Sequence, residues 1–222
     1  MKKSTGIMGL TLIGILSIGS VTAFAQSSNN TVPKNTVMTE KAVEQDSYKA
    51  NELKDVALNA FQKNFNETID TKNLYERNHE FFEVDGRKFY TAGWSNKDSK
   101  FVNGNTAIYY NAIIDAETNK IVNLDYRPGE PKDQNYKNFS YDEAKNLATD
   151  FVKTNNILDG KSYEFSEAQS KEGIAAKDSK EAWEYNFYFK YDGGKTCLVN
   201  VNKDLKKVTQ FALDIDADKT HG

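Results

Sequence analysis

The sequence has few of the residues that form disulfides, metal centres and common catalytic centres. Among its 222 residues it has one cysteine, Cys197, and two histidines, His79 and His221. One cysteine excludes an intramolecular disulfide, so the folded part has to be stable through its hydrophobic core alone. Cys197 lies in an apolar segment, which predicts a buried small hydrophobic residue rather than a reactive thiol.

A basic surface is also missing. The formal net charge is −3, which argues against nucleic acid as a partner. The patterns of a nucleophilic serine at a sharp turn, a phosphate-binding glycine loop and a paired cysteine and histidine are all absent. The sequence therefore predicts no catalytic, cofactor-binding or metal-binding residue, no cofactor and no enzymatic activity.

The long apolar run of this chain lies near its N-terminus. Lys2 and Lys3 precede apolar residues 7–21, and residues 23–25 (Ala-Phe-Ala) have the small side chains of a signal-peptidase site. The run is short and rich in glycine for a membrane helix, although an uncleaved anchor is the alternative. Cleavage after residue 25 removes both lysines and changes the formal charge from −3 to −5. We expect a secreted protein, with cell-wall association as an alternative, and no membrane span after cleavage.

An apolar pattern with helical spacing occurs twice, 91 residues apart. Apolar residues at positions i, i+3, i+4, i+7 and i+8 form one stripe on an otherwise polar helix. The stripes consist of Leu53, Val56, Ala57, Ala60 and Phe61 in the first copy and of Ala144, Leu147, Ala148, Phe151 and Val152 in the second. Ser140 and Glu143 form a capping box that marks the start of the second helix.

A hairpin pattern also occurs twice, 87 residues apart. In each copy an alternating strand leads through a polar turn into a second strand. Ile114-Asp115, Lys120-Ile121 and Leu124 correspond in this way to Val201-Asn202, Lys207-Val208 and Phe211. Because two landmarks repeat in the same order, we infer a duplicated unit. Further strands are expected at 74–84 and 87–94, around the Asp85-Gly86 turn, and at 163–168 and 183–190.

These patterns predict an α+β fold that is a tandem repeat of a helix packed on an antiparallel sheet of about four strands. The expected boundaries are a signal peptide at 1–25, a flexible leader at 26–46, a first domain at 47–127, a linker at 128–138 and a second domain at 139–216.

Two motifs resemble metal sites but are incomplete. Residues 79–83 (HEFFE) have glutamate where a zinc-protease helix has its second histidine, and they lie in a strand-like stretch, so His79 is expected to be a half-exposed strand residue. Asp214, Asp216 and Asp218 alternate as in a calcium loop but lack its glycine and closing glutamate. Weak cation binding and a solvated acidic tail both stay open for these three residues.

The helix and hairpin patterns resemble the PepSY family, in particular the PepSY-like repeated domain of YcdB-type exported bacterial proteins. The helix motif of the family corresponds to residues 140–148, and its closing hairpin corresponds to 114–121 and, without the turn glycine or asparagine, to 201–208. The resemblance covers about residues 47–214. It implies a helix on an antiparallel sheet, somewhat cystatin-like, and a non-enzymatic role, since such domains occur in protease propeptides and are thought to restrain peptidases.

Three functions follow from this resemblance and from the composition. The first is binding and modulation, by inhibition, of a secreted or wall-associated peptidase, with that protein as partner. The second is binding to a cell-envelope component or scaffolding within the envelope. The third is a hydrolase of unrecognised type, which requires clustered carboxylates or a histidine in a cleft.

Overall fold

The computed structural model describes residues 40–97, 107–129, 139–170 and 184–214. The first half of the chain contributes helix α1 (Glu40–Phe65), the 3-10 turn η2 (Thr71–Asn73) and strands β1 (Tyr75–Val84), β2 (Arg87–Ser95), β3 (Ile108–Asp115) and β4 (Ile121–Pro128). The second half contributes helix α2 (Tyr141–Thr154) and strands β5 (Tyr163–Phe165), β6 (Glu184–Tyr191), β7 (Lys195–Asn202) and β8 (Lys207–Ala212).

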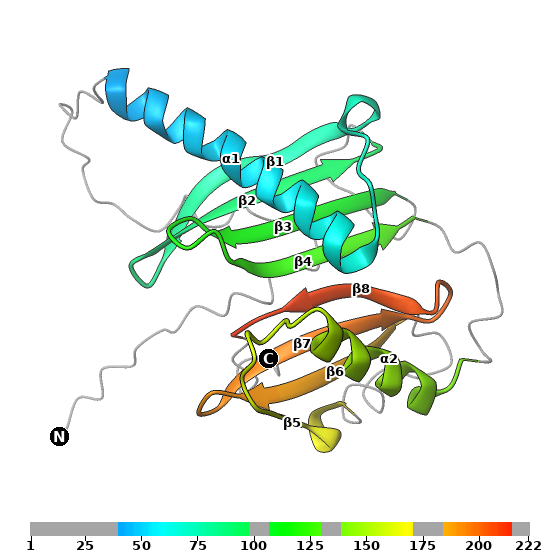
Figure 1. The fold of residues 1–222 in the computed structure, drawn as a ribbon. Helices are drawn as coiled ribbons and strands as arrows, with labels where there is room; N and C mark the ends of the chain where they lie inside the picture. Colours follow the sequence, from blue (N-terminus) through cyan, green and yellow to red (C-terminus); the bar gives the residue numbers. More distant parts are fainter. Residues whose placement is uncertain (1–39, 98–106, 130–138, 171–183, 215–222) are drawn as a thin grey trace, which may run out of the picture.

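All eight strands belong to one antiparallel sheet with the order β1-β2-β3-β4-β8-β7-β6-β5. The predicted tandem repeat of a helix on a separate four-stranded sheet is therefore wrong. The two sets of strands join edge to edge because β4 pairs with β8. Helix α1 contacts β2, β3 and β4, and α2 contacts β6, β7 and β8, so that both helices lie on the same face of the sheet (Figure 1).

Local sequence signals explain where several of these elements begin and end. The Ser140 hydroxyl accepts a hydrogen bond from the Glu143 amide at 3.2 Å, and the Glu143 carboxylate accepts one from the Ser140 amide at 3.0 Å. This capping box satisfies two amides at the start of α2. Asp85 and Gly86 have φ values of 50° and 75°, the left-handed geometry of a tight hairpin turn between β1 and β2. Helix α1, in contrast, begins at Glu40, inside the segment expected to be a leader.

The closing hairpins of the two halves correspond in their first strands and in the position of a β-bulge. Strands β3 and β7 both have eight residues and begin 87 residues apart. Each hairpin contains one register shift, between Ile113 and Ile114 in the first and between Asn200 and Val201 in the second. These positions also differ by 87, so the same β-bulge occurs in both copies.

The turns of the two hairpins correspond as well. The Asp115 carboxylate accepts a hydrogen bond from the Thr118 amide at 3.0 Å, and the Asn202 side chain accepts one from the Leu205 amide at 2.9 Å. A short polar side chain at this position therefore holds each turn closed. The repeat inferred from the sequence thus has a structural counterpart in these hairpins, although the two copies share one sheet.

The junction between the two halves, which we call the seam, is the ladder between β4 and β8. It has three residue pairs: Asn123 with Ala212, Leu124 with Phe211, and Asp125 with Gln210.

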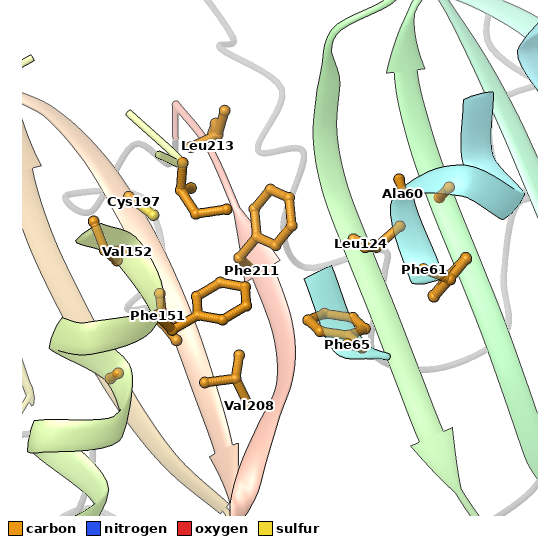
Figure 2. Packing of buried hydrophobic residues seen from close by; sticks show 14 of the residues in the cluster. Ala60, Phe61, Phe65, Leu124, Phe151, Val152, Cys197, Val208, Phe211 and Leu213 are labelled. Atoms are coloured by element: carbon orange, nitrogen blue, oxygen red, sulfur yellow. The ribbon is translucent and has the colours of Figure 1, made fainter. Parts of the chain in front are cut away.

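On the helical side of the seam, Phe65 from the end of α1 stacks on Phe151 of α2, with ring centroids 5.9 Å apart, and meets Phe211 edge-on at 6.4 Å. Figure 2 shows Phe65 between this pair and Leu124. These side chains all belong to one hydrophobic core that includes residues of both halves. Burial of each of them contributes about 1.5–3 kcal/mol to the stability of the fold.

Two ion pairs cross the seam in a reciprocal way. Lys120, in the turn of the first hairpin, pairs with Asp159, which follows α2 in the sequence. Lys207, its counterpart in the second hairpin, pairs with Glu67, which follows α1 in the sequence. Because all four side chains are partly exposed, each pair contributes about 0–1 kcal/mol, well below the apolar contribution of the seam.

Candidate functional site

The sheet has a second face, which neither α1 nor α2 covers. Alternation along the strands directs Leu124, Phe211 and Val199 to the helical face and directs their neighbours to the opposite one. At the seam, these neighbours are polar. A row of five polar residues crosses five adjacent strands in direct register. We call it the polar row, and it consists of Asn111, Asp125, Gln210, Asn200 and Asn186.

Three amide side chains at the seam are linked by hydrogen bonds. Asn200 Nδ2 donates to Gln210 Oε1 at 2.6 Å, and Gln210 Nε2 donates to Asn123 Oδ1 at 3.1 Å. Asn123 lies beside the polar row, opposite Ala212. Gln210 thus joins a residue of the first half to a residue of the second half.

The two ends of this amide chain have unused hydrogen-bonding groups. Asn123 Nδ2 and Asn200 Oδ1 are buried and have no hydrogen-bond partner, and the two side chains belong to residues that are 3% and 8% exposed. A buried amide group without a partner costs about 1–3 kcal/mol. The seam therefore contains one amide nitrogen and one amide oxygen without a partner, both shielded from solvent, on either side of Gln210.

A buried carboxylate lies next to these amides in the polar row. Asp125 is opposite Gln210 in the ladder, and its Oδ2 is 3.4 Å from Arg127 Nε. Burial raises the pKa of Asp125 above its usual range, and the Arg127 charge opposes this effect. The Arg127 guanidinium is also 6.0 Å from the ring of Tyr109, whose pKa burial raises to about 12. The face therefore combines amides, one carboxylate, one guanidinium and an aromatic ring.

His79 is held in β1 by structural contacts. Its Nε2 is 2.8 Å from the Gly93 carbonyl oxygen, and its ring meets Trp94 edge-on at 5.1 Å. Its side chain is 10% exposed, less than the half-exposed residue expected from the sequence. Burial lowers the pKa of His79, and the Gly93 bond and Glu76 partly oppose this effect.

Two other residues considered in the sequence, Cys197 and Asp214, lie within the described part of the chain and have structural roles there. Cys197 is fully buried, as predicted, and burial raises the pKa of its thiol to about 12. Asp214 accepts a hydrogen bond from the Tyr191 hydroxyl at 2.6 Å, while Asp216, Asp218 and His221 lie outside the described residues. Within the described part of the chain, no group of three or more His, Cys, Asp and Glu side chains is placed to hold a metal ion.

The amide chain at the seam was not predicted from the sequence. A usable signal was present, because Asn200 and Asn123 both lie in strands beside residues of the core, where an unpaired amide is costly. The pairing of β4 with β8 that brings Asn123 to Gln210 has no local sequence signal.

Comparison with known proteins identified no relative of this chain. No family model, no curated protein and no solved structure matches this chain. Among the residues that the structure describes, no helix has the length and apolar character needed to cross a membrane.

Proposed function

We propose that this protein is an exported, non-catalytic binding protein that binds and inhibits an extracellular or wall-associated peptidase. The observation that carries the proposal is the pair of matching hairpins, which share a β-bulge and have turns closed by Asp115 and Asn202. These hairpins are part of the pattern in which the chain resembles the PepSY family. That resemblance supports a peptidase as the partner.

The architecture also supports a role in binding. The apolar seam joins the two halves of the chain in one sheet and one core, which sets their relative position. A preorganised surface loses little conformational entropy when a partner binds.

The direct test adds purified residues 26–222 to the secreted peptidases of the producing organism. The expected result is a dose-dependent fall in the rate of proteolysis. An unrelated protein of similar size at the same concentration is the control, because any added protein can compete as a substrate. Proteolysis that continues unchanged at saturating protein would contradict the proposal.

A second candidate is binding to a cell-envelope component. The observation that favours it is that Arg127 lies beside the ring of Tyr109 and that both side chains are partly exposed, since glycans are bound by charged groups and aromatic rings. This function predicts that the protein sediments with isolated wall material. A protein that stays entirely in the supernatant would exclude it.

A further inference from the structure

We propose that the outer edge of strand β1 binds an extended, basic segment of a partner protein. β1 is the first strand in the order of the sheet, and in the described part of the chain it pairs on one side only, with β2. An extended segment that adds to such an edge is held by backbone hydrogen bonds, while its side chains set the specificity. This inference rests on the proposed binding function and names the surface and the kind of partner.

The register of β1 shows which of its backbone groups point away from the sheet. The Lys88 carbonyl oxygen accepts a hydrogen bond from the Ala116 amide at 2.9 Å, so Lys88 directs its backbone groups to the β3 side of β2. In an antiparallel strand, the N–H and C=O of one residue point to the same side, and successive residues alternate. Glu83 is opposite Lys88 and therefore directs both groups away from β2, as Phe81 does two residues earlier. A partner strand thus meets two donors and two acceptors at this edge.

Two glutamates give this edge its charge. Glu80 and Glu83 lie on opposite faces of β1, because side chains alternate along a strand. Both are exposed, and neither makes an ion pair with any described residue. Lys88, which is opposite Glu83 in the ladder, pairs instead with Asp46 at 3.2 Å. Charge complementarity therefore favours a basic segment, whereas a second copy of β1 would bring two more glutamates to the edge.

Two aromatic residues lie between the glutamates and are half-buried. The ring of Phe81 is 4.9 Å from that of Tyr90 on one face, and the ring of Phe82 stacks on Phe89 at 5.5 Å on the other. Each phenylalanine can cover an apolar side chain of an added strand. The matching segment therefore has the order basic, apolar, apolar, basic, with a basic residue opposite each glutamate.

The geometry of the sheet limits the segment to a short one and to this edge. A register shift between Arg77 and Glu80 interrupts the ladder, so the regular part of β1 is 80–84. The opposite edge offers less, since β5 has three residues and the Ser166 amide beyond it bonds to the Tyr188 carbonyl at 2.8 Å.

The experiment titrates the full mature chain with the blocked peptide acetyl-Thr-Lys-Val-Val-Lys-Thr-amide and follows backbone amide signals by NMR. We expect the signals of Phe81 and Glu83 to shift with a saturable dependence on peptide concentration. The matched peptide with glutamate in place of both lysines should bind about tenfold more weakly, because it sets like charges against Glu80 and Glu83.

N-methylated peptides separate strand addition from general charge attraction. In the expected register, the second valine is opposite Phe81 and directs its N–H at the edge, whereas the first valine is opposite Phe82 and directs its N–H to solvent. Methylation of the second valine N–H should abolish the saturable shift. Methylation of the first valine N–H is the control and should weaken binding far less.

Charge reversal on the protein provides the complementary test. Glu80→Lys together with Glu83→Lys should invert the preference, so that the glutamate peptide binds more tightly. Both side chains are exposed, so the variant should keep its fold. Glu164→Lys makes the same change at an exposed glutamate of β5, the other edge strand, and should keep the preference for the lysine peptide.

Three outcomes would overturn the inference. One is that the Phe81 and Glu83 signals stay unmoved up to the solubility limit of the lysine peptide. Another is equal binding of the lysine and glutamate peptides. The third is equal binding of the two N-methylated peptides. The unchanged protein provides all three results, so they do not depend on whether a variant folds. Peptide binding without inhibition of proteolysis would contradict the proposed function alone, whereas inhibition without peptide binding would contradict this inference alone.

Discussion

Leu124 and Phe211 lie directly opposite each other in the β4–β8 ladder, and they occupy the same position in the two copies of the repeat. Two equivalent antiparallel strands that pair through equivalent residues are related by a local two-fold axis, as in a symmetric dimer interface. An axis that runs through the sheet at this pair places both helices on one face. It also explains the reciprocal ion pairs of Lys120 and Lys207.

The first prediction is that the seam makes the two halves unfold together. Leu124→Ala removes a fully buried side chain at the axis and should lower the free energy of unfolding by about 2–5 kcal/mol. Because the core is continuous, hydrogen exchange should show the same loss of protection in β2–β3 and in β6–β7.

The matched control for this experiment is Leu147→Ala. Leu147 is on α2 and is 37% exposed, so its truncation should change the free energy of unfolding by about 0.5 kcal/mol or less. Loss of protection confined to the first half in Leu124→Ala would show that the seam does not couple the halves.

The second prediction concerns a strained turn residue. Lys206 has a φ of 51°, and its counterpart Asn119 has a φ of 57°. Asparagine adopts this left-handed conformation more readily than lysine. Lys206→Asn should therefore stabilise the protein by about 0.5 kcal/mol, a rise of about 1–2 °C in Tm by calorimetry.

The reverse exchange is the control for this turn. Asn119→Lys should cost more than Lys206→Asn gains, because the Asn119 side chain also bonds to Lys49 at 2.8 Å and to Glu52 at 2.6 Å. Unchanged or lower Tm values for Lys206→Asn would mean that strain at this position is not limiting.

The third prediction is a loss of stability in mild acid that depends on His79. Burial lowers the pKa of His79 in the folded protein below the usual histidine value of about 6.5. The unfolded chain therefore binds the proton more readily, and the stabilisation is fully present above about pH 6.5 and is lost as the pH falls toward the folded pKa. Urea unfolding at pH 7.5, 6.5 and 5.5 measures this loss.

His79→Gln isolates the contribution of the histidine, since glutamine does not titrate but can donate to the Gly93 carbonyl. The variant should show a smaller fall in stability between pH 7.5 and 5.5 than the unchanged protein. Identical slopes would assign the acid sensitivity to carboxylates instead.

The fourth prediction is that the Cys197 thiol is inert in the folded protein. Burial, together with the Asp214 charge, raises its pKa to about 12, so the reactive thiolate is scarce at pH 8. An aromatic disulfide reagent should leave Cys197 unmodified in buffer and modify it completely in urea. Rapid modification of the native protein would show that β7 opens locally.

The local elements were predictable from the sequence, whereas their assembly was not. The Asp85-Gly86 turn, the Ser140 capping box, the two hairpins and the burial of Cys197 all follow from residues close together in the chain, and the structure confirms them. Strand β5 is shorter than expected because its pairing with β6 ends at Phe165.

The amide chain and the single sheet could not be predicted for one common reason. Both depend on the three residue pairs between β4 and β8, whose members lie more than 80 residues apart. An alternating strand such as β4 has the same pattern whether its outer edge is exposed or paired.

By itself, the sequence determined the second helix and the two matching hairpins, because helical spacing, turn residues and repeated landmarks are local properties of the chain. Only the tertiary structure decided that the two copies form one sheet and that Asn123 and Asn200 end up on either side of Gln210. The physical reason is that each copy buries its last strand more completely against its counterpart than it could alone, and Phe65, Phe151 and Phe211 pack at that junction.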